Sequence, residues 1–462
     1  MAIRRILIAN RGEIAVRIIR TCRTLGIETV LAVSAADRDG EPARQADRIV
    51  CIGPARSADS YLNAPAIVHA AVATGADAIH PGYGFLSERA VLPQLCATAG
   101  IVFIGPTADQ IAAVGDKLRA RAEAEAAQVP VVPGGPVDTR AEAEELARKI
   151  GAPLLVKAVA GGGGRGLKRV GRLEEMPELL DLAAAEAGAA FGDARLYLEH
   201  YIDRGRHIEV QVLGDGTGGV IQLGERDCSV QRRYQKLIEE TPAPGLPESL
   251  RRSLQRAAVR FAQRLSYRGA GTVEFIVDTE REAFYFLEMN ARIQVEHPVT
   301  EAVTGIDLIA EQIAIADGGG LRLRQSEVGA MGCAIECRIN AEDYRSDFRP
   351  SPGRVQSVSW PSGDGIRVDS HVVPGSSIPP FYDSLMGKII ASGADRAGAL
   401  RRLRGAIAAT RISGVKSNLG FHSAVLEDPE FQAGGVDTGY VDRLYARRSD
   451  LFAQTESGAA HG

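Results

Sequence analysis

The sequence predicts a multidomain protein of α/β and α+β structure, and three observations support this. At 462 residues, the chain is long enough for about three domains of ~150 residues each. From residue 1 to about 115, short apolar runs alternate with amphipathic helical patterns, which is typical of a parallel α/β domain. Beyond about residue 331, short strands interrupted by glycine and proline precede a helical pattern, which predicts an α+β unit.

The composition is that of an ordinary globular protein. Charged residues make up 24% and hydrophobic residues 45% of the chain, and the net charge is -4 at pH 7. This balance provides no global basic field, so we expect no nucleic-acid partner. No run of about 18 apolar residues and no signal segment occur, so we expect a cytoplasmic protein with no membrane partner. The six cysteines form no CxxC pair, and we expect reduced thiols.

The first unit, residues 1–115, alternates strands with helices. Apolar residues between the first two strands fall on one face of a helix, namely Ile14, Ile18, Ile19, Cys22 and Leu25. We expect the strands at residues 6–9, 29–33, 48–52, 78–80 and 102–105. This order predicts a parallel sheet with helices on both sides.

The second unit, residues 116–330, begins with an alanine-rich helical pattern, after which a proline- and glycine-rich connector at 129–136 predicts a hinge. The segment 137–203 then forms a small subdomain with a glycine tract at 161–166, which strand patterns flank on both sides. Such a tract is either a linker or a hairpin whose backbone amides approach phosphate oxygens, and the flanking strands favour the hairpin. On a hinged unit, this hairpin could act as a lid that excludes water.

A cation-rich run follows at residues 225–236, with Arg226, Arg232, Arg233 and Lys236. Taken alone, such a run is more typical of a solvated surface than of a binding site. Its interpretation therefore depends on the motifs around it.

Two apolar strands of the second unit carry residues that suit a metal ion. Glu274 lies within the first strand, and Glu288 and Asn290 end the second. Alternate residues of a strand share a face, so we expect Glu288 and Asn290 to point the same way, with Phe284 and Phe286 behind them. Carboxylate and amide oxygens suit Mg²⁺ that carries nucleotide phosphates. The alternative is that both glutamates form structural ion pairs with arginines.

The third unit, residues 331–446, contains strand patterns such as 353–359 and a helical pattern from 396 to 409. The segment 447–462 is small and polar, and we expect a flexible tail. These features make the third unit the predicted α+β domain.

Several motifs together resemble the biotin carboxylase family, the ATP-grasp component of biotin-dependent carboxylases. The likeness covers residues 3–445, and its most specific motif is Arg292-Ile293-Gln294-Val295-Glu296-His297-Pro298. The other matching segments are residues 10–15, 80–88, 161–166, 225–236, 288–300 and 336–343. The resemblance implies an N-terminal α/β domain, a central ATP-grasp domain with a mobile lid, and an α+β C-terminal domain. It also overturns the solvated-surface interpretation of the cation-rich run.

The resemblance implies a site for ATP with Mg²⁺ or Mn²⁺. Lys117 and Lys157 would hold phosphate oxygens as point charges. The metal would bind Glu274, Glu288 and Asn290. Other nucleotide contacts would come from Tyr83, Gly162, Gly163, Gly164, Glu199, Ile202, His207 and Gln231.

The resemblance also implies the catalytic groups. Glu296 would deprotonate bicarbonate, whose attack on the γ-phosphate would give carboxyphosphate, so positioning and charge neutralisation should dominate. Arg338 would stabilise the enolate of biotin. Bicarbonate itself would bind Lys236, Arg292, Gln294, Val295 and Glu296.

The same resemblance implies partners. The chain contains no Met-Lys-Met biotin-acceptor motif, so biotin would arrive on a separate biotin carboxyl carrier protein, and carboxyltransferase subunits would use the product. Acetyl-CoA carboxylase of fatty acid biosynthesis is one setting of this kind. Two other functions stay open, namely another ATP-grasp carboxylate-amine ligase and a catalytically silent ATP-binding scaffold. Glu296 and Arg338 in their full motifs argue against both.

The chain departs from the usual family residues at several positions. Ala160, His200, Tyr234 and Ala291 replace common residues near the implied nucleotide site. At the homodimer contact that the resemblance implies, Arg20 and Arg367 are present. Thr24 and Asp364 stand there in place of an acidic and an aromatic residue, and Asp364 could pair with an arginine across the two-fold axis.

Overall fold

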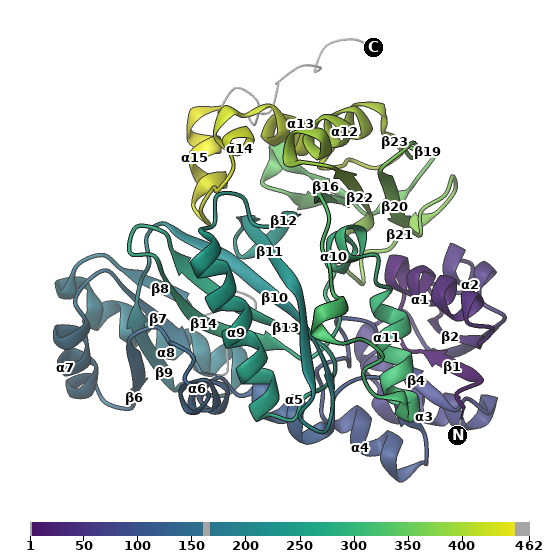
Figure 1. Cartoon of the computed structure of the whole chain (residues 1–462), viewed down its shortest axis with the longest axis horizontal. Coiled ribbons are helices and arrows are strands. Elements are labelled where there is room, and N and C mark those ends of the chain that lie inside the picture. Colours follow the sequence, from purple (N-terminus) through teal and green to yellow (C-terminus); the bar gives the residue numbers. More distant parts are fainter. Residues whose placement is uncertain (1, 160–166, 449–462) are drawn as a thin grey trace.

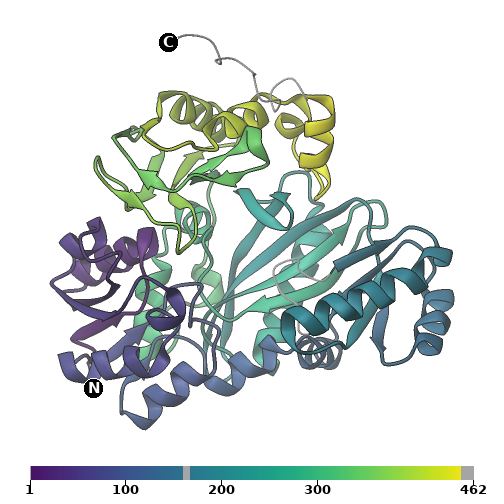
Figure 2. The same cartoon turned by 180° about the vertical axis from the view of Figure 1, so that it is seen from behind.

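The computed structural model describes residues 2–159 and 167–448, which form three lobes (Figure 1). Residues of all three lobes line one cleft. Seen from behind, the N-terminal lobe and the small subdomain of residues 137–159 and 167–203 lie on opposite sides of a large central sheet (Figure 2). The predicted glycine tract and most of the predicted tail lie outside the described residues.

The N-terminal lobe is the parallel α/β domain that the sequence predicts. Its five strands pair in parallel in the order β3-β2-β1-β4-β5. Leu7 belongs to one buried apolar cluster and Ile6 and Ile8 to another, because helices cover both faces of the sheet. The elements are β1 (Arg5–Ile8), α1 (Gly12–Thr24), β2 (Glu28–Ser34), α2 (Glu41–Gln45), β3 (Arg48–Gly53), η1 (Ser57–Asp59), α3 (Ala64–Thr74), β4 (Ala78–His80), α4 (Val91–Thr98), β5 (Val102–Phe103) and α5 (Ala108–Gly115).

A small antiparallel sheet follows, in the order β6-β9-β7-β8, with an apolar cluster of its own. β7 and β8 pair as a hairpin, which confirms that strands flank the glycine tract. A separate core is what a lid that moves as a unit requires. The elements are α6 (Lys117–Ala126), β6 (Gly134–Val137), α7 (Arg140–Ile150), β7 (Leu154–Ala158), β8 (Leu167–Val170), η2 (Leu173–Glu175), α8 (Met176–Phe191) and β9 (Leu196–His200).

The central lobe is built on long antiparallel strands, and α9 packs on one face of them. The opposite face carries the predicted metal-binding carboxylates. The elements are β10 (Gly205–Asp215), β11 (Val220–Arg232), β12 (Gln235–Thr241), α9 (Glu248–Arg264), β13 (Arg268–Asp278), β14 (Ala283–Asn290), α10 (His297–Thr304), α11 (Leu308–Ala314), η3 (Ile315–Gly319) and η4 (Gln325–Glu327).

The C-terminal lobe continues the same sheet. Its order is β14-β13-β10-β11-β12-β15-β22-β20, and the β12–β15 pair crosses the boundary predicted near residue 330. The elements are β15 (Cys333–Asn340), β16 (Glu342–Asp343), η5 (Tyr344–Ser346), β17 (Arg349–Pro350), β18 (Gly353–Arg354), β19 (Ser357–Ser359), β20 (Ile366–Ser370), β21 (Ser377–Ile378), β22 (Leu385–Gly393), α12 (Arg396–Ala409), β23 (Arg411–Ser413), α13 (Leu419–Glu427), α14 (Pro429–Ala433) and α15 (Tyr440–Arg447).

One sequence prediction about β14 was wrong. Phe284 and Phe286 do not lie on the face of Glu288, because the register between β13 and β14 shifts between Glu274 and Phe275. This bulge moves both aromatic rings to the core face, where Phe286 packs 4.7 Å from the Phe261 ring. The carboxylates therefore face the cleft, whereas Phe286 packs against Phe261 in the core and also borders the cleft.

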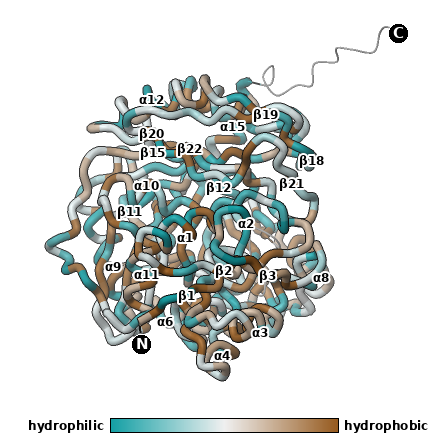
Figure 3. The backbone as a smooth tube through the Cα atoms, turned by 90° about the vertical axis from the view of Figure 1, so that its right-hand side faces the viewer, coloured by the Kyte–Doolittle hydropathy of each residue, from teal (hydrophilic) through white to brown (hydrophobic). Residues whose placement is uncertain are grey.

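Within the part of the chain that the structure describes, no helix combines the length and apolarity needed to cross a membrane. Figure 3 shows short hydrophobic stretches that alternate with hydrophilic ones along the tube. The six cysteines all lie in described segments, and none of them forms a disulfide there.

Candidate active site

The cleft has a volume of about 1050 Å³ and receives residues from all three lobes. Glu296 is fully buried behind the wall of the cleft. It contacts Lys236 and Arg338, which line the cleft. Gly162, Gly163 and Gly164 lie outside the described residues. The other sequence-predicted residues all line the cleft, namely Tyr83, Lys117, Lys157, Glu199, Ile202, His207, Gln231, Lys236, Glu274, Glu288, Asn290, Arg292, Gln294, Val295 and Arg338.

Two cations from neighbouring strands meet at Glu296. Lys236 Nζ on β12 lies 2.7 Å from Glu296 Oε1, and Arg338 Nη2 on β15 lies 2.9 Å from Oε2. Lys236 also contacts Glu209 at 2.6 Å and Glu274 at 2.9 Å. A carboxylate held between fixed cations next to a cleft is suited to proton transfer from a bound anion.

Charge pairing shifts the pKa values of this group. Burial opposes ionisation of Glu296, but Lys236, Arg338 and Arg226 hold the pKa of its carboxyl well below the ordinary value. Burial would lower the pKa of Lys236, yet the surrounding glutamates raise it well above the ordinary value. Glu296 is therefore ionised and Lys236 protonated at neutral pH. Glu296 becomes a stronger base when a substrate anion competes for either cation.

The segment after β14 holds a guanidinium in a fixed orientation. Arg292 Nε donates to Glu88 at 2.8 Å, Nη2 to Asn290 Oδ1 at 3.0 Å, and Nη1 to Gln294 Oε1 at 2.9 Å. Gln294 Nε2 in turn donates to Glu274 at 3.0 Å. A planar guanidinium beside an amide matches the geometry of a small planar oxyanion.

The predicted metal ligands fit a divalent cation. Glu274 and Glu288 lie opposite each other on β13 and β14, with Asn290 Nδ2 2.8 Å from Glu274. The Glu288 side chain points into the cleft. Partial loss of solvent between the cleft walls raises the pKa of its carboxyl, and the charge of Glu274 raises it further. A hard cation would relieve this repulsion. Among the described residues, no arginine pairs with either glutamate, which disfavours the structural alternative.

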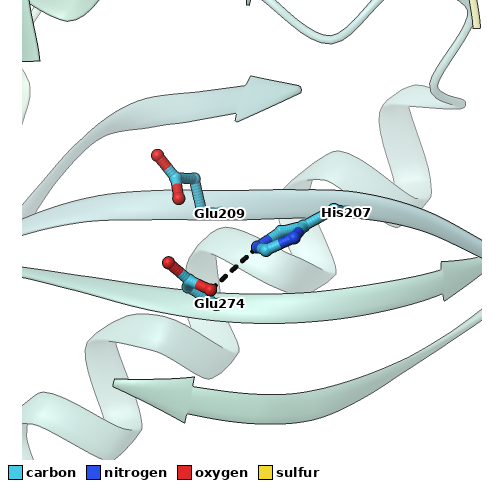
Figure 4. A group of neighbouring side chains, drawn as sticks. All are labelled: His207, Glu209 and Glu274. Atoms are coloured by element: carbon cyan, nitrogen blue, oxygen red, sulfur yellow. Dashed lines mark hydrogen bonds and ion pairs between the residues drawn. The ribbon is translucent and has the colours of Figure 1, made fainter. Parts of the chain in front are cut away.

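His207 lies beside these carboxylates. Figure 4 shows its ring pointing from β10 towards Glu274, with Nε2 2.8 Å from the carboxylate. Burial would lower the pKa of His207, but Glu274 outweighs it and raises that pKa. Ligand atoms of His207, Glu209 and Glu274 lie within 4.8 Å of one another, so these three residues form one compact group at the metal end of the cleft.

The other end of the cleft carries the predicted nucleotide residues. Lys157 on β7 forms an ion pair with Glu199 on β9. Burial lowers the pKa of Lys117; the charge of Glu288 opposes this shift, and the charge of Lys157 adds to it. Two ammonium groups that lower each other's stability in this way favour a bound polyanion. Ile202 and Gln231 complete this end of the wall.

A buried contact joins all three lobes behind the cleft. Lys388 Nζ on β22 donates to the Val295 carbonyl at 2.7 Å and lies 3.0 Å from Glu13 on α1. The Tyr83 hydroxyl donates to the same Glu13 carboxylate. Each lobe therefore holds a group that fixes the backbone next to Glu296.

Sequence reasoning missed several residues of this site, namely Glu13, Glu88, Glu209, Lys388 and Glu239, which pairs with Arg338. Glu274 was identified from the sequence because it is a carboxylate within an apolar strand. Glu209 and Glu239 meet the same criterion and could have been found in the same way. Arg226 in the cation-rich run is fully buried and contacts Glu209 at 2.6 Å, so this arginine does not lie on a solvated surface.

Family models match all three lobes. The model of the biotin carboxylase N-terminal domain matches residues 2–111, and that of the biotin carboxylase C-terminal domain matches 336–443. The ATP-binding domain of the carbamoyl-phosphate synthase L chain matches residues 116–324 between them.

Individual proteins match over nearly the whole chain. The biotin carboxylase of Nostoc sp. is 53% identical over 95% of this chain and 99% of that protein, and biotin carboxylase 1 of Bacillus subtilis is 50% identical over 95% and 98%. The Campylobacter jejuni biotin carboxylase in complex with β,γ-ATP has a TM-score of 0.92 at 46% identity, covering 96% of this chain and 99% of that one. The biotin carboxylase domain dimer of Hydrogenobacter thermophilus 2-oxoglutarate carboxylase, with MgADP, ADP and bicarbonate, has a TM-score of 0.92 at 44% identity, covering 99% and 100%.

Proposed function

Because this chain belongs to the biotin carboxylase family and catalyses the MgATP-dependent carboxylation of biotin with bicarbonate, we propose that the residues around Glu296 carry out the chemistry. The observation that carries this proposal is that Lys236 and Arg338 each contact a different oxygen of the Glu296 carboxylate. A base held in this way has a fixed position and a defined charge state.

Bicarbonate binds between Arg292, Gln294 and the Val295 amide, with Lys236 at its side. As the anion takes over part of the charge of Lys236, Glu296 gains basicity and removes the bicarbonate proton. The resulting carbonate oxygen attacks the γ-phosphorus of ATP and displaces ADP, which gives carboxyphosphate. The residues contribute mainly positioning and charge neutralisation, as is usual for phosphoryl transfer.

Glu274, Glu288 and Asn290 hold the divalent cation, which supplies neutralisation of charge on the phosphate oxygens. Lys117 and Lys157 bind phosphate oxygens from the opposite end of the cleft. The remaining nucleotide contacts fall to Gly162, Gly163, Gly164, Tyr83, Glu199, Ile202, His207 and Gln231.

Arg338 serves the second half-reaction. Carboxyphosphate releases CO₂, and the phosphate that remains takes the ureido proton of biotin. The guanidinium of Arg338 then stabilises the ureido enolate, which attacks CO₂. A preorganised cation of this kind acts on charge that exists only during reaction.

We also propose the assembly. Biotin is presented on a biotin carboxyl carrier protein, and a carboxyltransferase passes the carboxyl group to an acyl-CoA or keto acid. The chain forms a homodimer, a proposal that the dimer described for the Hydrogenobacter thermophilus domain supports.

One assay tests the proposed function. In the presence of Mg²⁺, full ADP formation should require both bicarbonate and free biotin. Omission of bicarbonate should reduce it to background, and omission of biotin should leave only a slow bicarbonate-dependent ATPase. ATP cleavage that requires an amine instead would favour another ATP-grasp ligase. ATP binding with no cleavage under any of these conditions would favour a scaffold.

A further inference from the structure

Two glutamates next to Arg338 have no place in the proposed mechanism. Glu239 and Glu336 lie directly opposite each other on β12 and β15, and both are fully buried. Arg338 Nε donates to Glu239 Oε1 at 2.6 Å, and Arg338 Nη2 lies 2.5 Å from the same oxygen and 2.9 Å from Glu296. The guanidinium is therefore held between Glu239 and Glu296.

Glu336 has a different environment. Neither of its carboxylate oxygens has a hydrogen-bond partner among the described residues, nor does the second oxygen of Glu239. An ionised carboxylate buried in this way would carry a large desolvation cost, whereas a neutral acid would not. Burial raises the pKa of Glu336 well above the ordinary value, the charge of Lys388 opposes this shift, and that of Glu239 adds to it.

Among the described residues, every cation near Glu336 already contacts another group, so none is left to neutralise an ionised Glu336. Lys388 on β22 already contacts Glu13 and the Val295 carbonyl. His297 on α10 uses Nδ1 at the Gln294 carbonyl, and burial holds its pKa well below the ordinary value, so the ring is neutral. On β12 the facing group is Glu239, for which burial raises the pKa of the carboxyl to about 7, while the contact with Arg338 opposes this shift and favours the ionised form. Glu296 in the loop before α10 is an anion, because neighbouring cations hold its pKa well below the ordinary value. Glu301 on α10 pairs with Arg17 and Arg367.

We propose that Glu239 is a positioning residue that holds the Arg338 guanidinium against Glu296, and that Glu336 is a neutral carboxylic acid in the active enzyme. This inference rests on the proposed role of Arg338 in the second half-reaction. Ionisation of Glu336 would place a second negative charge beside Glu239 and bind the guanidinium too tightly for it to meet the biotin enolate. The protonation state of Glu336 therefore controls whether the Arg338 guanidinium can contact the biotin enolate.

Glu239→Gln tests the positioning role. It removes the charge that holds Arg338 but leaves the bicarbonate site, so biotin carboxylation should fall about tenfold or more, while bicarbonate-dependent ATP cleavage stays within about twofold of the wild type. Glu239→Asp, which keeps the charge, should recover part of the carboxylation. Equal loss of both activities, or an Asp variant no better than the Gln variant, would overturn the positioning role.

Glu336→Gln tests the neutral acid, because glutamine has the shape of the protonated side chain and does not titrate. The infrared spectrum of the wild type at neutral pH should contain a carbonyl stretch from a protonated carboxyl group that the variant lacks. Carboxylation by the variant should also persist to higher pH than in the wild type. The matched control is Glu311→Gln, which removes a carboxylate paired with Arg322 far from Arg338 and should leave both the band and the pH profile unchanged.

These experiments distinguish failure of the Glu336 assignment from failure of the proposed function. An infrared band that survives Glu336→Gln, or an alkaline limb of the pH profile that does not move, would overturn the neutral-acid assignment. If the wild type shows no bicarbonate-dependent ATP cleavage, the proposed function fails, whereas the infrared comparison still decides the state of Glu336. The infrared comparison also stands if the Glu239 variants do not fold.

Discussion

Single residues at this site act through charges that are buried together. Lys236 is nearly inaccessible to solvent and contacts the carboxylates of Glu209, Glu274 and Glu296. Without its ammonium group, these three negative charges would lie close together with no cation between them. Breaking such a group is costly, because each remaining charge stays desolvated. The cluster therefore fixes the position of the base while its net charge remains small.

Glu288→Gln keeps the shape of the side chain and removes its charge. We expect Mg²⁺-dependent turnover to fall about 100-fold or more, because an electrostatic group of the reaction is lost. The measurement is ADP formation across a Mg²⁺ titration. Glu280→Gln is the control, since Glu280 is an exposed carboxylate in the turn between β13 and β14. Wild-type activity of Glu288→Gln at limiting Mg²⁺ would contradict the metal role.

Arg338→Gln should separate the two half-reactions. The variant should lose most biotin carboxylation, because the cation that stabilises the enolate is gone. It should retain a slow bicarbonate-dependent ATPase, because Lys236 still contacts Glu296. Both rates are to be measured on the same folded preparation. Arg345→Gln, an exposed arginine of the same lobe, should leave both rates unchanged. Equal loss of the two activities in folded protein would refute the role of Arg338.

At the scale of elements, the site depends on contacts between segments that are distant in sequence. α1, β22 and the loop before α10 meet at Lys388, whose side chain is fully buried. The loop has no regular structure of its own to fix the Val295 peptide. Its geometry is therefore set by the lobes that pack around it.

Lys388→Met should destabilise the protein by about 3–5 kcal/mol, because Glu13 would remain buried without its cation. The KM for bicarbonate should rise as well, since the Val295 carbonyl loses its donor. The free energy of unfolding is measured by urea titration, and Lys388→Met combined with Glu13→Gln serves as the comparison. The double variant should be less destabilised than the sum of the single variants. Strict additivity would show that the two side chains are not coupled.

At the scale of the whole molecule, the predicted dimer contact contains more charge than aromatic packing. Arg20 and Arg367 both pair with Asp369, at 3.1 and 2.6 Å. The Asp364 side chain is 96% exposed and lies 3.2 Å from Arg402 of the same chain, so it is not held by strong pairing and stays available to a second copy.

We predict a dimer that dissociates as the salt concentration rises, because ion pairs are screened and an aromatic anchor worth about 2 kcal/mol or more is absent. Sedimentation at low micromolar protein, in ~50 and ~500 mM salt, measures this. Asp364→Phe should strengthen the dimer and reduce its salt dependence. A protein that is monomeric in both solutions, or equally dimeric in both, would refute the prediction.

The sequence by itself determined the parallel N-terminal sheet, the strands on both sides of the glycine tract, and the residues of the motif around Glu296. These features are local: periodicity of apolar residues sets the elements, and short spacing brings motif residues together. The same reasoning assigned Phe284 and Phe286 to the wrong face, because a bulge depends on the partner strand and not on the strand alone.

Only the tertiary structure decided which distant groups complete the site. Glu88 and Arg292 are 204 residues apart, and Lys388 and Val295 are 93 residues apart, yet both pairs are in contact. The opposition of Glu239 and Glu336 likewise follows from the register of β12 and β15. Periodicity contains no information on such pairings, because the side-chain pattern of a strand says which face a residue occupies and not which residue lies across from it.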